Sequence, residues 1–190
     1  MATTSINPRI TAGSGIASAA EIRAAFAENR EELMWLAEFL SDDLLTASAC
    51  VTDARDLMEN NKEEEICSEC LQAWTREAIV RSVLDLKRTR IAALSSTYEL
   101  EDVVCRQPQP MSSSTVDLVV RESDIVCMRL DSLCRFAVVL CGFEQRSADQ
   151  AARFLGVSKH AVEAAYSRAL EILEVIYCQT VLESYGLAVA

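Results

Sequence analysis

The sequence predicts an all-α protein made of two small helical domains. Glycine and proline are scarce, at five and three residues among 190. Ala, Leu, Glu and Arg are abundant and runs of β-branched residues are few, a composition that favours helices over sheets. Apolar residues make up 51% of the chain, which is too many for a disordered protein and enough for a buried core. A linker rich in proline, glutamine and serine, residues 104–115, divides the chain.

Residues 1–19 are expected to form a flexible tail of a cytoplasmic protein. They contain one Arg, many small polar residues and no sustained apolar stretch, so they lack the parts of a secretory signal. The longest unbroken apolar run, Phe136–Cys141, is far shorter than the roughly 20 residues of a membrane-spanning helix. No membrane partner is therefore expected. Without an export signal, the eight cysteines are expected to be reduced thiols.

The first domain, residues 20–103, is expected to hold three helices. Residues 20–40 place apolar side chains at a spacing close to 3.6, which makes one helix face. A second helix is expected from Leu44 to about Met58. A third is expected from Glu63 to about Arg90, with apolar side chains along one side.

Charge is distributed unevenly between the two halves. Residues 20–103 hold nine Lys or Arg against nineteen Asp or Glu, a net charge of about -10, while residues 104–190 hold eight against ten, a net charge of about -2. This asymmetry predicts different partners for the two domains. The acidic run Glu63–Glu65 suits the positive end of a helix dipole, and the alternative is a docking surface for a basic partner.

The second domain, residues 116–190, is expected to contain a helix-turn-helix. Two helices at 116–130 and 131–142 come first. Ser147 is a natural N-cap for a short helix at 148–155, Gly156 suits a left-handed turn, and Ser158 can cap the helix that follows. Ala152, Gly156 and Val162 have the spacing that lets two helices approach closely across a tight turn. The alternative is an αα-hairpin that merely packs.

The stretch Leu130–Leu173 resembles region 4 of the sigma-70 family of RNA polymerase sigma factors, particularly the small extracytoplasmic-function type. The residues that match the family pattern are Ala151, Ala152, Leu155, Gly156, Ser158, Val162, Arg168, Ala169 and Leu173. The first domain is similar to region 2, with Trp74, Asp85 and the basic cluster Lys87–Arg90 in the helix that contacts the promoter in the family. The order of a region 2, a linker and a region 4 fits the length.

The resemblance implies a transcription initiation factor that binds core RNA polymerase through residues 20–103 and addresses promoter DNA through the helix beginning near Ser158. It implies no cofactor and leaves room for an anti-sigma regulator as a further partner. The side chains that this helix would offer to DNA are Ser158, Lys159, His160, Tyr166 and Arg168. For Arg168 the alternative is an ion pair with Glu171 or Glu174 on its own helix.

The recognition helix departs from the family pattern at four positions. Glu163, Ala164 and Ala165 stand where basic or polar side chains are usual, and Leu170 stands where a second Arg is common. Because Lys and Arg contacts to phosphate dominate nucleic-acid affinity, DNA binding by the protein alone is expected to be weak and sensitive to salt. The alternative function is a degenerate sigma-like adaptor or decoy that binds polymerase or a regulator without reading DNA.

No enzymatic or metal site is predicted. The chain has one His and five Gly, and it offers no nucleophile with a base and no glycine-rich phosphate loop. Cys67 and Cys70 form a CxxC pair, but a structural zinc site needs four ligands. The two thiols are expected to face the core as small apolar groups, and the alternative is a redox or metal role. Cys127, Cys134 and Cys141 are likewise expected in the core.

Overall fold

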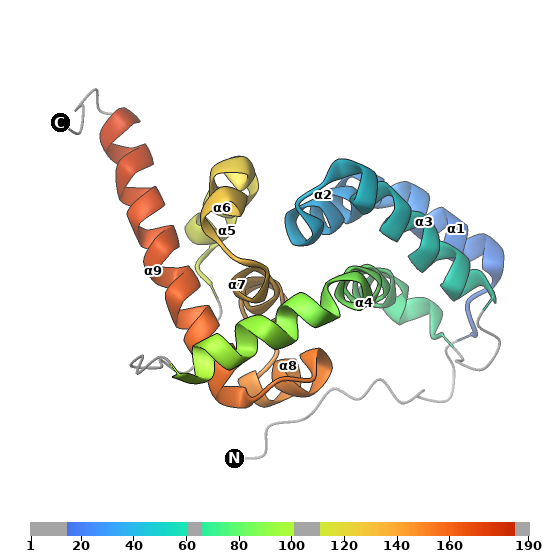
Figure 1. Ribbon diagram of the computed structural model, residues 1–190. Coiled ribbons are helices and arrows are strands. Elements are labelled where there is room, and N and C mark those ends of the chain that lie inside the picture. The colour runs from blue at the N-terminus through green and yellow to red at the C-terminus, as the bar shows by residue number, and fades with distance from the viewer. Residues whose placement is uncertain (1–14, 61–65, 101–110, 185–190) are drawn as a thin grey trace, which may run out of the picture. The chain divides into compact units, whose positions relative to one another are not determined.

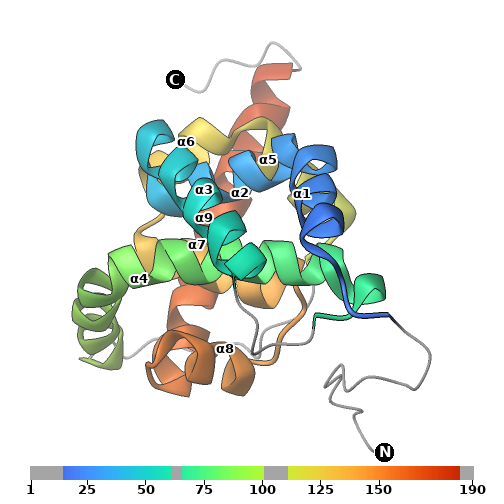
Figure 2. The ribbon, with the colours of Figure 1, turned by 90° about the vertical axis from the view of Figure 1, so that its right-hand side faces the viewer.

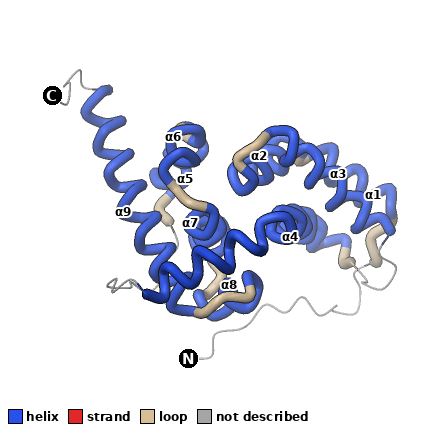
Figure 3. The backbone as a smooth tube through the Cα atoms, viewed as in Figure 1, coloured by secondary structure: helices blue, strands red, loops and turns tan. Residues whose placement is uncertain are grey.

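The computed structural model describes residues 15–60, 66–100 and 111–184, and it confirms the all-α class (Figure 1). Figure 3 shows helices joined by loops throughout these ranges. The elements are α1 (Ala19–Glu28), α2 (Arg30–Ser41), α3 (Leu44–Asn60), the 3-10 turn η1 (Ser68–Cys70), α4 (Leu71–Leu100), α5 (Ser113–Arg121), α6 (Ser123–Arg129), α7 (Ser132–Ala137), the π-helical segment η2 (Val138–Phe143), α8 (Ala148–Leu155) and α9 (Lys159–Ser184).

The chain forms two compact units, Met1–Asp85 and Leu86–Ala190. The boundary falls inside α4 and therefore precedes the predicted linker at 104–115. Most of that linker, up to residue 110, lies outside the described residues. Its last residues are helical, because the Ser112 side chain accepts the Thr115 N–H at 3.2 Å and starts α5 there.

In the first unit, the helix predicted at 20–40 is two helices that separate at Asn29. Asn29 leaves helical backbone, at φ -102° and ψ 18°. Its side-chain amide donates to the Ala25 carbonyl at 2.8 Å. A side chain that bonds to the local backbone in this way competes with continuation of the helix. Apolar spacing alone did not reveal the break.

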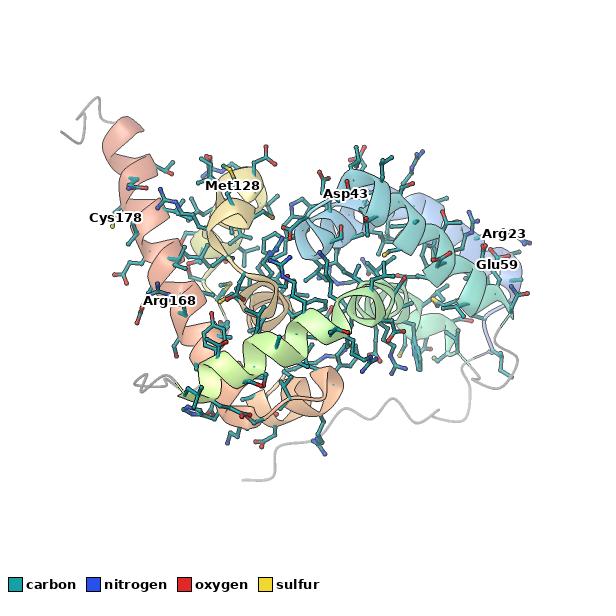
Figure 4. All side chains as sticks on the ribbon, viewed as in Figure 1. Arg23, Asp43, Glu59, Met128, Arg168 and Cys178 are labelled. Atoms are coloured by element: carbon teal, nitrogen blue, oxygen red, sulfur yellow. The ribbon has the colours of Figure 1, made fainter. Side chains whose placement is uncertain are left out.

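The first unit has its core between α2 and α3, and α1 packs against both. The fully buried side chains of α2 and α3 are Leu33, Leu36, Ala37, Leu40, Ala47, Cys50 and Ala54. At the surface, Arg23 of α1 pairs with Glu59 of α3 at 2.9 Å (Figure 4). Arg76 of α4 pairs with Glu32 of α2. The apolar contacts carry most of the stability, because an exposed ion pair contributes at most about 1 kcal/mol.

The third helix of the first half begins later than predicted. α4 starts at Leu71 and continues to Leu100, while the Glu63–Glu65 run lies outside the described residues. Just before η1, the Ile66 carbonyl accepts the Ala17 N–H at 2.8 Å, and the Ser68 N–H donates to the Gly15 carbonyl at 3.2 Å. The prediction of a flexible tail is therefore wrong for residues 15–19, which pair with the chain or begin α1. Residues 1–14 lie outside the described residues.

In the second unit, the helices predicted at 116–130 and 131–142 are each divided. Glu122, at φ -105° and ψ 29°, separates α5 from α6. Asp131 caps α7 by accepting the Cys134 N–H at 2.8 Å, and α7 continues into η2. The described side chains of α7 are all buried, as is η2 up to Gly142. These segments form the centre of the unit, with α7 against α9 and η2 against both α8 and α9. Figure 2 shows α8 beside the lower part of α9.

Replacing Gly156 by Ala is expected to destabilise the fold through backbone strain alone. Gly156 has φ +70°, and a methyl group added there meets no atom within 4 Å. The left-handed conformation costs an L-residue roughly 1–2 kcal/mol. We expect Gly156→Ala to lower the free energy of unfolding of the full chain by about 1 kcal/mol, as measured by urea denaturation.

The matched control is Gly15→Ala, where an added methyl also meets no atom within 4 Å and φ is not positive. It is expected to change the free energy of unfolding by less than about 0.5 kcal/mol. Equal losses at Gly15 and Gly156 would contradict the backbone explanation.

Candidate nucleic-acid interface

Helices α8 and α9 meet at a tightly specified turn. The Ser147 hydroxyl accepts the Gln150 N–H at 3.3 Å, and the Gln150 side chain accepts the Ser147 N–H at 2.9 Å, so that α8 begins in a capping box. Gly156 ends α8 in the left-handed conformation. The Ser158 hydroxyl then accepts the Ala161 N–H at 3.1 Å and caps α9. The three predicted roles of Ser147, Gly156 and Ser158 are confirmed.

The second and third turns of α9 are almost entirely buried. Only Glu163 and Arg168 interrupt the buried residues of this stretch, and Glu163 is half-buried. The buried residues are Ala161, Val162, Ala164, Ala165, Tyr166, Ser167 and Ala169. Most of them are small, which allows neighbouring helices to approach α9 closely. Exposed surface at the beginning of α9 is therefore confined to its first turn and to Arg168.

The sequence predicted that Tyr166 contacts DNA, and this prediction is wrong because the residue is buried. Its side chain is 1% exposed. Burial, with a smaller effect of the nearby Cys141 thiol, raises the pKa of Tyr166 to about 12. The hydroxyl oxygen lies 3.4 Å from the position that a Cβ atom would occupy on Gly142, so the ring fills the core between α9 and η2. A polar aromatic residue on a recognition helix is an ambiguous signal, because the same residue also suits a core.

Of the remaining predicted contacts, Lys159 and His160 lie exposed on the first turn of α9. The Lys159 Nζ is 3.4 Å from a carboxylate oxygen of Asp149 and 3.7 Å from one of Glu163. Ser158 is half-buried and its hydroxyl is used by the cap. The structure therefore brings Lys159 and His160 together at the turn and assigns Ser158 a structural role.

Arg168 lies further along α9 and projects outward from the helix (Figure 4). Its side chain is 58% exposed, and a guanidinium nitrogen lies 3.6 Å from a carboxylate oxygen of Glu171. This is the ion pair that the sequence left open as the alternative for Arg168. Because the pair is exposed and at the outer limit of contact, it is weak and leaves the guanidinium accessible to a phosphate.

Arg153 on α8 is a candidate contact that sequence reasoning missed. Its side chain is exposed, and its Nε donates to the Asp149 carbonyl at 3.2 Å. Asp149 therefore contacts both cations, Arg153 through its backbone carbonyl and Lys159 through its carboxylate. Its position one turn before Gly156 is the signal that could have revealed it, because that turn faces the start of the next helix.

The exposed charges around this turn nearly cancel. Three cations, Arg153, Lys159 and Arg168, stand against three acids, Asp149, Glu163 and Glu171. Lys159 pairs with Asp149 and Glu163, and Arg168 pairs with Glu171. Nucleic-acid affinity depends on cations that release counterions from phosphate. Because the nearby acids repel phosphate and compete for these cations, this arrangement predicts weak binding to DNA by the protein alone.

A buried polar network holds the end of α4 to the start of α7 within the second unit. The Tyr98 hydroxyl donates to a carboxylate oxygen of Asp131 at 2.7 Å and lies 3.0 Å from the Cys134 sulfur. Burial raises the pKa of the Tyr98 hydroxyl, and it raises the pKa of the Cys134 thiol to about 12. Arg135 beside them is 1% exposed, and burial lowers its pKa to about 10. This network positions α7, against which α9 packs.

Within the described ranges, no group of three or more His, Cys, Asp or Glu side chains is arranged to hold a metal ion. No helix in that part of the chain is long and apolar enough to cross a membrane. No protein-family model matches the sequence, and a search of curated proteins also found no match.

The raised pKa values predict that the fold loses stability in alkaline solution. Burial raises the pKa of Tyr166, Cys134 and Cys141 each to about 12, above ordinary values of about 10 for Tyr and 8.5 for Cys. The folded state therefore holds these protons more strongly than the unfolded state. Their stabilising contribution is complete below about pH 8.5 and is lost progressively as the pH rises towards 12.

Tyr166→Phe removes one of these groups. Between pH 10 and 12 it is expected to make the decline in the free energy of unfolding shallower, by up to about 1.4 kcal/mol per pH unit. Urea denaturation at a series of pH values measures the slope. Tyr177→Phe, on the exposed part of the same helix, is the control, and an equal change of slope in both variants would refute the role assigned to burial of Tyr166.

Proposed function

We propose that the protein is a sigma-70-like transcription initiation factor. In this proposal the first unit binds core RNA polymerase, and the turn between α8 and α9 faces promoter DNA as a helix-turn-helix. The main observation in support of the proposal is the geometry of the turn between α8 and α9. Ser147 caps the start of α8, Gly156 ends it in the left-handed conformation, and Ser158 caps the start of α9. The protein acts without a cofactor and without catalysing a reaction, in the compartment that holds the polymerase, the cytoplasm.

Only a few residues are proposed to contact DNA. In helix-turn-helix proteins the N-terminal residues of the recognition helix contact base edges. Here these are Lys159 and His160, which are exposed, with Arg153 from α8 beside them. Arg168 supplies a phosphate contact further along the helix. Tyr166 is excluded because it is buried.

Weak DNA binding is compatible with this function, because a sigma factor acts while bound to polymerase. Tethering converts a weak contact into an intramolecular one at high effective concentration. Residues 19–60, which contain helices α1–α3, carry ten acidic side chains against three basic ones. Such a surface attracts a basic partner and speeds the encounter with it, which supports a docking role for the first unit.

A second candidate function is an adaptor or decoy that binds polymerase or a regulator without reading DNA. The specific observation in its favour is the neutralisation of Lys159 by Asp149 and Glu163. The buried Ala164 and Ala165 also favour it, because they remove two positions from which a recognition helix usually reaches the groove.

Titration into labelled core RNA polymerase, with and without promoter DNA, distinguishes the two functions. A sigma factor binds the polymerase and increases retention of the promoter, whereas an adaptor binds the polymerase without that increase. Lys159→Glu combined with Arg168→Glu is expected to abolish the gain in DNA retention and to leave polymerase binding intact. Unchanged retention in this double variant would sink the DNA-reading proposal, and failure to bind polymerase would sink both functions.

Removing the acids that pair with Lys159 is expected to strengthen DNA binding. Asp149→Asn with Glu163→Gln leaves the side-chain sizes unchanged and frees the ammonium group. At about 0.1 M salt, one added phosphate contact corresponds to a roughly fivefold to tenfold gain in affinity. Fluorescence anisotropy with duplex DNA measures this gain and its salt dependence.

Asp117→Asn with Glu174→Gln is the matched control, because these exposed acids make no ion pair with Lys159 and the net charge changes equally. An equal gain in the control would attribute the effect to net charge alone and contradict a local interface.

A further inference from the structure

Cys67 and Cys70 lie at the two ends of a single turn in the first unit. The Cys70 N–H donates to the Cys67 carbonyl at 3.0 Å, which closes the 3-10 turn η1 directly before α4. A hydrogen bond from residue i+3 to residue i places the two Cα atoms within about 7 Å of each other. Disulfides require Cα atoms within the same limit. The backbone of this turn is therefore compatible with a bridge between the two cysteines.

The two side chains are accessible and adjacent. Both residues are half-buried, in contrast to the fully buried Cys50, Cys134 and Cys141. Besides burial, the neighbouring Cys67 thiol also raises the pKa of the Cys70 thiol. The prediction that both would lie in the core as inert apolar groups is therefore wrong. They combine proximity with access for a small reagent, the two requirements of thiol–disulfide exchange.

We infer that Cys67 and Cys70 are a redox-active dithiol, which closes to an intramolecular disulfide by exchange with a low-molecular-weight disulfide. The inference does not depend on the proposed function. Unlike an isolated cysteine, the pair can release the incoming group after it reacts, because the second thiol is held next to the first.

With glutathione disulfide as the oxidant, the exchange balances in two steps. One cysteine thiolate attacks the glutathione S–S bond, forms a mixed disulfide and releases one glutathione thiolate. The other cysteine then attacks the mixed disulfide at the protein sulfur, forms the Cys67–Cys70 bond and releases the second glutathione. Two electrons pass from the protein to the oxidant, and the two thiol protons end on the released glutathione molecules.

The turn that would be bridged also holds the beginning of the described chain. The Ser68 N–H donates to the Gly15 carbonyl at 3.2 Å, and the Ser68 hydroxyl donates to the same carbonyl at 3.0 Å. Ile16 pairs with Cys67 itself. Because these contacts preorganise the turn, the disulfide is expected to form more readily in the folded protein than in the unfolded chain. The ratio of the equilibrium constants for disulfide formation in the folded and unfolded protein measures this preference. By linkage, the disulfide increases the equilibrium constant for folding of the turn by the same ratio.

The surroundings also predict how the reaction depends on pH. Burial and the neighbouring Cys67 raise the pKa of the Cys70 thiol. Since only the thiolate attacks, closure of the pair is expected to accelerate as the pH rises above neutrality.

The test is equilibration of the full-length protein in buffers of reduced and oxidised glutathione, followed by acid quenching, alkylation and peptide mapping. Cys105→Ser and Cys178→Ser are included in the background to prevent bridges between molecules. The measured quantity is the effective concentration of the Cys67 thiol with respect to the Cys70 thiol, calculated from the equilibrium with glutathione. It is determined in native buffer and in concentrated urea. We expect the native value to exceed the denatured value by roughly tenfold or more.

Formation of the disulfide lowers the mass of the peptide by two hydrogens. Cys67→Ser and Cys70→Ser are each expected to abolish this loss of mass, whereas Cys127→Ser is expected to preserve it. Circular dichroism of each variant verifies that its helices are intact. Equal effective concentrations in native buffer and in urea would overturn the inference. A mixed disulfide with glutathione that never closes would also overturn it.

Discussion

The close packing around the buried part of α9 is the constraint on which the second unit depends. Ala161, Ala164, Ala165 and Ala169 present almost no side-chain bulk, so α7 and α8 can approach the helix closely. That approach requires a sharp reversal between α8 and α9, and Gly156 provides it at φ +70°. A larger residue along this face of α9 would separate the helices and expose the apolar α7 and η2 segments.

The same constraint limits what α9 can offer to a nucleic acid. A helix packed on several sides cannot present a long groove-reading face, so recognition is restricted to its first turn and to Arg168. The ion pairs of Lys159 with Asp149 and Glu163 reduce the positive potential further. If the proposed function holds, both features mean that α9 contacts DNA effectively only while a larger partner holds the protein on the DNA.

The sequence predicted the local chemistry of this site better than its surroundings. Capping and turn signals depend on neighbouring residues, so Ser147, Gly156 and Ser158 were identified correctly. Burial depends on helices distant in sequence, which is why Tyr166 was misplaced and Cys67 and Cys70 were expected in the core. The break at Asn29 was missed because a side-chain bond to Ala25 interrupts the helix without disturbing the apolar spacing.

Site-specific photocrosslinking from position 160 is the most direct test of whether the first turn of α9 faces DNA. A photoreactive amino acid replaces His160 in one variant and Tyr177, on the exposed end of the same helix, in another. In a complex with core RNA polymerase and promoter DNA, we expect crosslinks to DNA from position 160 and none from position 177. Crosslinks from position 160 to polymerase alone would contradict DNA recognition by α9.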